Sequence, residues 1–179
     1  GRRVAYHVWR SRQVRGGIRG VPVVYAVEVG GMDMANAEVE GLRGYLYAGG
    51  FLIVEDFWGS RECDIFEYNI RRVYPDRPII DIGIEHPLYS AYYQIDEVMQ
   101  VPARGRGIRG RPTEECYGCR AAVRGMLDDD GRPRVTITLN TALGEAWEWG
   151  EDPYYTRTYS APVKHQAGAD DHHMVELER

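Results

Sequence analysis

The sequence predicts one α/β domain with a mostly parallel sheet. Residues 21–29 (VPVVYAVEV) and 51–55 (FLIVE) are apolar, β-branched runs that are typical of strands buried on both faces. Each run is followed by a segment whose apolar residues recur at helical spacing. Because right-handed crossovers place the strands of successive β-α-β units parallel, this order predicts a single sheet with helices packed on it.

The first helix is predicted over residues 36–48. Val39, Leu42 and Leu46 recur there at helical spacing, and two glycines follow as a stop. The second helix must end before Pro75, since a residue that precedes proline is disfavoured in a helix. Its apolar face is marked by Ile65, Phe66, Ile70 and Val73.

The remaining strands are predicted from shorter runs. Residues 78–82 are expected to form a third strand parallel to the first two. Residues 121–127 and 134–140 flank the turn sequence DDDG, and the second of these segments alternates apolar and polar residues. This pattern predicts a hairpin at the edge of the sheet.

Length and composition are those of a single globular domain over residues 1–179. The mass is 20.4 kDa, with 44% hydrophobic and 27% charged residues, which suffices to bury a core without metal or disulfides. No apolar run approaches the ~20 residues that a membrane-spanning helix requires. We therefore expect a soluble protein with no membrane span.

Charge limits the classes of partner. A net charge of -5 argues against nucleic acid, because binding to phosphates depends largely on cations. The charge is uneven, with arginines crowding the N-terminal residues and acidic residues gathering near the C-terminus. Oppositely charged ends suit association with neighbouring copies, so a homo-oligomer or an extracellular assembly is one expectation.

Four segments together resemble a known bacterial family. They are LRGYLYAGGFLIVEDFWG (42–59), RRVYPDRP (71–78), EHPLYSAYYQIDEVMQVP (85–102) and DDDGRPRVTITLNTALGEAWEW (128–149). In this order they resemble the family of domain of unknown function 4159, over about residues 21–160. Residues 86–97 are also similar to a stretch of trehalose-utilisation proteins.

The resemblance implies a branch of the class I glutamine amidotransferase-like fold, a flavodoxin-like three-layer sandwich. Members are often exported, which implies a secreted or periplasmic location. Two departures concern the ends of the chain. The N-terminal portion is short and arginine-rich, and the final segment, usually an apolar helix in the family, reads HQAGADDHHMVELER.

An amidotransferase nucleophile is missing from the expected place. Such an enzyme needs a cysteine on the turn after a central strand, activated by a histidine. After residues 51–54 the chain instead has Glu55, Asp56, Phe57 and Trp58, and Cys63 falls inside the next predicted helix. The resemblance therefore supports the scaffold and not amidotransfer.

Asp56 and Trp58 are the first choice for a site. In open α/β sheets ligands bind outside the carboxyl ends of the strands, where both residues are predicted to lie. Two structural roles compete equally with a site, namely that Asp56 caps the following helix and that Trp58 packs on it.

Other polar and aromatic residues extend the list of candidates. His86, preceded by Glu85, could act as a general base or metal ligand, although a structural hydrogen bond in a loop is favoured. Asn140, Glu145 and Trp147 follow the last clear strand and could reach the same edge. Trp147 could stack on a sugar ring, although core packing is the commoner role of tryptophan.

The three cysteines favour structural roles. Cys116 and Cys119 form CYGC, whose spacing fits a redox pair or half of a zinc site, and no second such motif completes a zinc site. With Cys63, an exported protein would hold one disulfide and one free thiol. A disulfide or buried thiols are favoured over catalysis, and no metal or cofactor is predicted.

Two functional hypotheses remain. The first is a non-catalytic envelope or extracellular module that binds a ligand or assembles with copies of itself. The alternative is a carbohydrate-directed hydrolase or isomerase, in which Asp56 or Glu145 shares acid and base chemistry with His86. The first requires a filled or closed sheet edge, and the second requires that these side chains converge.

Overall fold

The computed structural model describes residues 5–8, 21–102 and 115–148. The arginine-rich N-terminal segment and the polar C-terminal tail lie outside these residues. The strands are β1 (Ala5–Val8), β2 (Val23–Val27), β3 (Phe51–Glu55), β4 (Ile80–Asp81), β5 (Ala122–Leu127) and β6 (Pro133–Leu139). The α-helices are α1 (Asn36–Tyr47), α2 (Gly59–Val73) and α4 (Leu143–Glu148), and the 3-10 helices are η1 (Val29–Gly31) and η2 (Pro87–Ser90).

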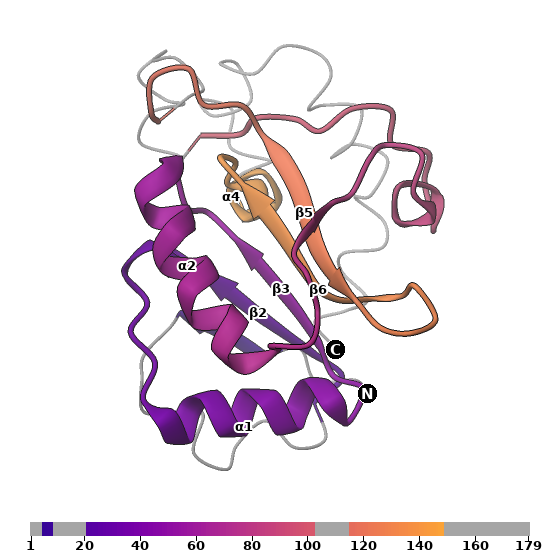
Figure 1. Ribbon diagram of the computed structural model, residues 1–179. Coiled ribbons are helices and arrows are strands. Elements are labelled where there is room, and N and C mark those ends of the chain that lie inside the picture. The colour runs from indigo at the N-terminus through magenta and orange to yellow at the C-terminus, as the bar shows by residue number, and fades with distance from the viewer. Residues whose placement is uncertain (1–4, 9–20, 103–114, 149–179) are drawn as a thin grey trace.

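The strands form one mixed sheet in the order β1-β2-β3-β6-β5-β4 (Figure 1). β1, β2, β3 and β6 run parallel to one another, whereas β5 is antiparallel to both of its neighbours, β6 and β4. The expectation of a mostly parallel sheet is therefore wrong. The expected third strand forms β4, but it pairs antiparallel with β5 and not beside β2 or β3, and the tight turn between β5 and β6 makes that second pair antiparallel as well.

The predicted hairpin of β5 and β6 is present, but it does not lie at the edge of the sheet. β6 pairs with β3 in the register Leu52↔Val135, and β4 pairs outside β5. The run from Val135 to Leu139 is buried throughout, its threonines included. A strand with both faces buried belongs to the interior of a sheet, which explains why this hairpin is central.

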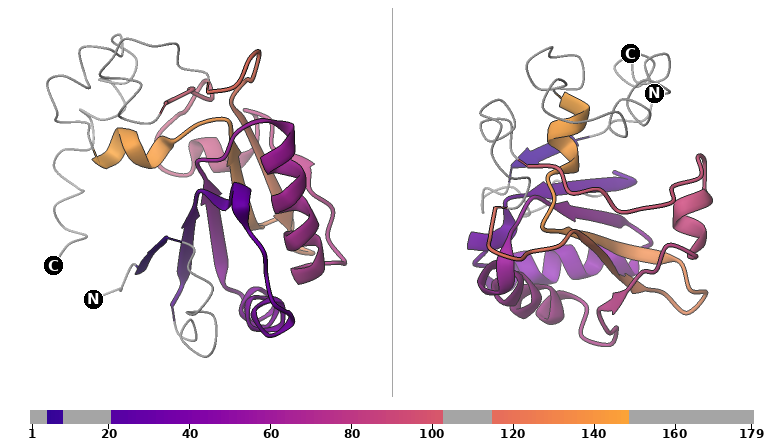
Figure 2. Two further views of the ribbon diagram at one scale, coloured as in Figure 1. Left: turned by 90° about the vertical axis from the view of Figure 1, so that its left-hand side faces the viewer. Right: turned by 90° about the horizontal axis from the view of Figure 1, so that it is seen from above.

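The core lies between the sheet and the two long helices, α1 and α2. Both cover the same face of the sheet, whereas α4 lies toward the other side (Figure 2). The predicted apolar faces are confirmed, since Leu42 and Leu46 of α1 and Phe66 and Ile70 of α2 are all buried. The described residues thus show a sheet and one helical layer, and they do not by themselves form a three-layer sandwich.

α2 ends where the sequence predicts, one residue before Tyr74 and two before Pro75. Its buried Asn69 fixes the segment that follows η1. The Asn69 amide donates to the carbonyl of Met32 at 2.9 Å and accepts from the backbone N–H of Met34 at 3.1 Å. A polar side chain buried at this depth needs such partners, and here it supplies the backbone with them.

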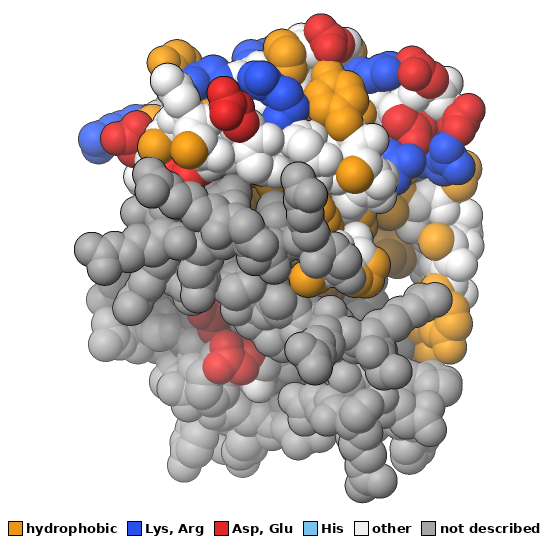
Figure 3. Space-filling view, turned by 90° about the horizontal axis from the view of Figure 1, so that it is seen from below, with side chains coloured by type: hydrophobic (Ala, Val, Ile, Leu, Met, Phe, Trp, Pro, Cys, Tyr) orange, Lys and Arg blue, Asp and Glu red, His pale blue; other side chains and the backbone are white. Residues whose placement is uncertain are grey.

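The β5–β6 turn carries a charged network. Asp128, at the β5–β6 turn, accepts the backbone N–H groups of Arg132 and Asp130, and these bonds hold the pKa of its carboxyl down at about 2. Arg134 joins Asp128 at 2.8 Å and donates to the carbonyl of Gly49 at 2.8 Å. From below, charges of both signs alternate among hydrophobic side chains on the described part of this face (Figure 3).

Candidate functional site

Three neighbouring strands end in the same unusual backbone conformation. Glu28, Asp56 and Asn140 directly follow β2, β3 and β6, and their φ angles are 54°, 56° and 58°. The carboxyl ends of these parallel strands point toward α4 and the beginning of α2 (Figure 1). Non-glycine residues with positive φ are strained and tend to gather at functional sites, so this edge is the candidate site.

Asp56 and Trp58 contact each other at this edge. The Trp58 indole Nε1–H donates to Asp56 Oδ1 at 3.1 Å. Burial raises the pKa of the Asp56 carboxyl above its ordinary value, and the indole donor opposes part of that shift. Negative charge nearby raises the pKa further, from the carboxylates of Glu115, Glu28 and Glu62.

The capping role considered for Asp56 is not the one that the structure shows. Trp58, not Asp56, is the residue that precedes α2, and its backbone N–H donates to Glu62 Oε2 at 2.7 Å. Glu62 therefore satisfies a free donor at the beginning of the helix. The Asp56 carboxyl is instead held by the indole, as a half-buried acid at the strand end.

Asn140 joins three segments around the edge. Its Oδ1 accepts from the backbone N–H of Gly59 at 2.8 Å, and its Nδ2 donates to the carbonyl of Arg120 at 2.8 Å. Its own carbonyl accepts from Gln100 Nε2 at 3.2 Å. The side chain is only 8% exposed, so its amide serves to position α2 and the neighbouring loops.

Glu55 is a part of this edge that sequence reasoning missed. It is 3% exposed, and its carboxyl accepts from the Tyr25 hydroxyl. The backbone N–H of Gly144 lies 2.9 Å from Glu55 Oε1 and 3.0 Å from Glu55 Oε2, and it donates to both oxygens. Burial raises its pKa to about 7, opposed by the Gly144 N–H and assisted by the charge of Asp56. A side chain at Gly144 would collide with this carboxyl, so the glycine permits the close approach.

The only sequence signal for Glu55 is its position as the last residue of the apolar run FLIVE. An acidic residue at the end of a strand is ordinarily expected to face solvent. What buries this one is the packing of α4 over the strand end, and that packing is not visible in the local sequence.

α4 brings two further candidates to the edge. Glu145 belongs to α4, and its charge adds to the raised pKa of Glu55. Trp147 is 57% exposed, and its ring centroid lies 6.3 Å from that of Tyr25 on β2. The edge thus combines carboxyl groups with two indoles, those of Trp58 and Trp147.

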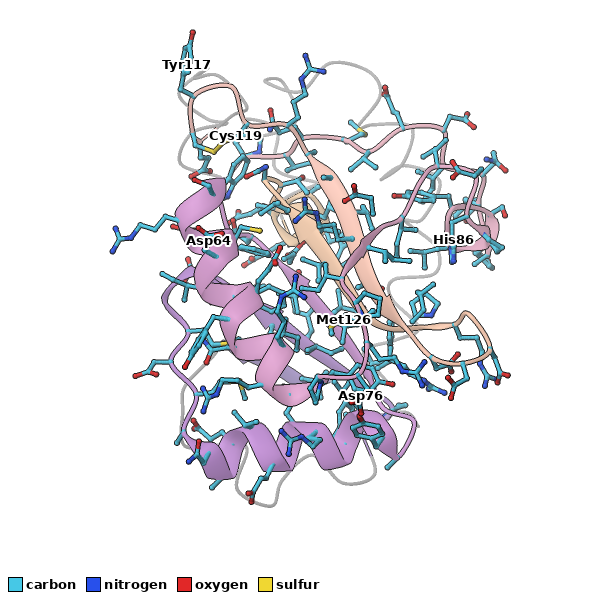
Figure 4. The ribbon with its side chains drawn as sticks, viewed as in Figure 1. Asp64, Asp76, His86, Tyr117, Cys119 and Met126 are labelled. Carbon is cyan, nitrogen blue, oxygen red and sulfur yellow. A yellow bond between two sulfur atoms is a disulfide. The ribbon has the colours of Figure 1, made fainter. Side chains whose placement is uncertain are left out.

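His86 and Glu85 lie elsewhere. They belong to the loop after β4, the strand at the far side of β5, and His86 stands at η2, away from the labelled Cys119 (Figure 4). His86 Nδ1 accepts from the backbone N–H of Leu88 at 3.1 Å and so caps η2. The structure does not bring this histidine to Asp56.

The structure pairs Cys116 with Cys119 in a disulfide whose Cα atoms are 5.5 Å apart. Cys63 is a free, half-buried thiol on α2 that lies 3.6 Å from Glu67 Oε1. Burial raises the pKa of the Cys63 thiol, and the Glu67 charge adds to the shift. Over residues 5–8, 21–102 and 115–148, no group of His, Cys, Asp and Glu side chains is arranged to hold a metal ion.

An open hollow of about 440 Å³ lies between α2 and the segment at the end of η1. Asp33, Asp64 and Tyr68 are among its lining residues, and none of the predicted site residues lines it. Asp64 is labelled on α2 in Figure 4. In the part of the chain that the structure describes, no helix is both long and apolar enough to cross a membrane.

Comparison with known proteins and family models assigns this sequence to a family. No curated protein matches the sequence. A family model described as domain of unknown function, DUF4159, matches residues 15–169, which contain every strand from β2 to β6 and the whole candidate edge. This match confirms the family predicted from the four sequence segments. The chain belongs to the DUF4159 family.

Proposed function

We propose that this chain is a non-catalytic binding module of the cell envelope or extracellular space, with its ligand contacting the edge around Asp56, Trp58 and Trp147. One observation carries the proposal. The polar side chains best placed for chemistry, Glu55 and Asn140, are buried and bound to backbone groups of the segments that cover the edge. Their hydrogen bonds therefore keep the segments around the edge in one arrangement.

The distribution of nucleophiles and bases supports the same reading. Cys116 and Cys119 are joined to each other, so neither is a free nucleophile for hydrolysis, and His86 uses its Nδ1 to cap η2. Among the described residues, none of the predicted acids lies with that histidine in the arrangement that acid–base catalysis requires. A binding surface has no need of such a pair.

A carbohydrate is the class of ligand that fits the exposed groups best. Indole rings stack on the apolar faces of sugars, and carboxylates accept hydrogen bonds from sugar hydroxyls. Trp147 is largely exposed, and Trp58 is held beside Asp56 by its indole N–H. Two indoles and one carboxyl group at the same sheet edge supply both kinds of contact.

Export and the complete fold belong to this proposal. A disulfide persists in oxidising compartments, so the bond between Cys116 and Cys119 supports a secreted or periplasmic location. The parallel strands β2, β3 and β6, with their carboxyl ends meeting at one edge, support a flavodoxin-like scaffold of the amidotransferase type.

Replacing Trp147 with alanine is expected to weaken binding to polysaccharide about tenfold, because the stacking contribution of one exposed aromatic ring is lost. The measurement is co-sedimentation of the full chain with insoluble cell-wall polysaccharide. Tyr92→Ala is the matched control, since Tyr92 is 74% exposed but lies after η2, and it should bind as the wild type does. Equal losses in both variants, or no binding by the wild type, would contradict the proposal.

The alternative is a carbohydrate-directed hydrolase or isomerase in which Asp56 donates a proton. It is favoured by the strained backbone of Asp56, its half-burial and its raised pKa, which are features of catalytic acids. Glu145 would be the second carboxyl group. Release of reducing sugar by the wild type and not by Asp56→Asn, with binding retained, would establish the enzyme, whereas binding without any product supports the module.

A further inference from the structure

The loop at residues 115–120 is cross-linked over a very short span. The disulfide between Cys116 and Cys119 encloses only Tyr117, which is fully exposed, and Gly118, whose φ is 70°. It ties together no distant elements of the fold. A disulfide that serves mainly to staple a fold closes a longer loop, because the loss of unfolded-state entropy grows with loop length.

Hydrogen bonds hold this loop in place in addition to the disulfide. The Cys119 N–H donates to the Cys116 carbonyl at 3.2 Å, and Gln100 Nε2 donates to the Cys119 carbonyl at 2.9 Å. Asn140 Nδ2 holds the next carbonyl, that of Arg120, at 2.8 Å. Because these bonds do not depend on the disulfide, we expect the loop backbone to stay in place when the disulfide is reduced, with the two sulfurs still facing each other.

The two sulfurs have different surroundings. Cys116 Sγ lies 3.8 Å from Asn140 Oδ1 and beside Gly59, the first residue of α2. Within the described residues, the hydrogen bonds of Cys119 are made by its backbone N–H and carbonyl. Once reduced, Cys116 therefore has an acceptor ready for its S–H group, whereas Cys119 is the sulfur left for exchange.

We propose that Cys116 and Cys119 form a reversible thiol–disulfide exchange site whose substrate is a peptide or protein dithiol. A substrate thiolate attacks Cys119 Sγ and breaks the disulfide, and Cys116 leaves as a thiolate that takes up a proton. The second substrate thiolate then attacks the substrate sulfur of the mixed disulfide and releases Cys119. The substrate is oxidised to a disulfide by two electrons, and the cysteine pair is reduced to two thiols.

This activity is separate from ligand binding at the strand ends. It requires neither Trp147 nor the Asp56 carboxyl, because the loop is held by Gln100 and Asn140. Polysaccharide binding and dithiol exchange can therefore fail independently of each other.

The first experiment is a redox titration of the full chain carrying Cys63→Ser, which leaves only the disulfide pair. The protein is equilibrated with mixtures of reduced and oxidised dithiothreitol, and its thiols are counted by maleimide labelling while circular dichroism follows the fold. We expect two thiols to appear in one step with the fold unchanged. A disulfide that is reduced only in denaturant, or a chain that unfolds on reduction, would overturn the proposal.

A matched pair of variants tests which cysteine forms the mixed disulfide. In the Cys63→Ser background, Cys116→Ser leaves Cys119 alone, and Cys119→Ser leaves Cys116 alone. We expect Cys119 to react with an aromatic disulfide reagent about tenfold faster, because the hydrogen bond to Asn140 holds Cys116 as the thiol. Equal rates, or a faster Cys116, would refute the assigned roles.

Discussion

Replacing Asn140 with alanine is expected to destabilise the folded chain by about 3 kcal/mol, through the loss of two buried hydrogen bonds and a left-handed backbone that alanine disfavours. The Gly59 N–H and the Arg120 carbonyl would lose their partner. Urea unfolding followed by tryptophan fluorescence measures the change. We expect Asn140 to contribute more to the free energy of unfolding than any other residue of the candidate edge.

Two further variants separate these causes. Asn140→Gly removes the same hydrogen bonds but adopts positive φ without strain, so it should be about 1 kcal/mol more stable than Asn140→Ala. Asn36→Ala serves as the surface control, since the Asn36 side chain is exposed and bonds only Arg72 among the described contacts. An Asn140→Ala variant no less stable than this control would show that the amide does not hold the edge together.

Replacing Glu55 with glutamine is expected to remove a loss of stability that the wild type suffers as the pH rises. The glutamine amide keeps an acceptor for the Gly144 N–H and is neutral at every pH. Its advantage over the wild type should be near zero at pH 4.5 and grow to about 3 kcal/mol at about pH 8.

The sign follows from the two pKa values of Glu55. Its folded-state pKa of about 7 lies above its ordinary value of 4.5, so between these values the folded chain holds a proton that the unfolded chain has released. Folding is therefore favoured less and less as the pH rises through this range, and the penalty is complete above about pH 7. Urea unfolding of both proteins across the range measures the difference, and parallel stability curves would show that Glu55 does not titrate in this way.

Much of the candidate edge could be predicted from one topological rule. Asp56 and Trp58 follow β3, and Asn140 follows β6, so parallel strands bring them together at their carboxyl ends. The sequence could not place His86 in the same way. His86 lies in the loop after β4, an edge strand of two residues. It is several residues beyond the end of that strand, so the rule for strand ends does not predict where its side chain lies.

The place of β6 shows why alternating patterns mislead. Val135, Ile137 and Leu139 alternate with threonines, which predicts a strand with one solvent-facing side. Thr136 and Thr138 are both buried. The Thr138 hydroxyl donates to the carbonyl of Val54 at 3.2 Å, whereas the Thr136 hydroxyl has no hydrogen-bond partner among the described residues. A partner of this kind offsets the cost of burying the Thr138 hydroxyl, and it lies on a strand 84 residues earlier in the chain, whereas burial of the Thr136 hydroxyl is not offset in this way.

The sequence by itself determined the α/β class, the two long helices with their buried faces, the hairpin and the family. These features depend on local periodicity and on motifs that can be read along the chain. Only the tertiary structure decided that β6 inserts between β3 and β5, that Glu55 is buried under α4, and that His86 stands apart from Asp56. Each of these depends on contacts between residues far apart in sequence, and burial of polar groups is favourable only once those contacts supply their hydrogen bonds.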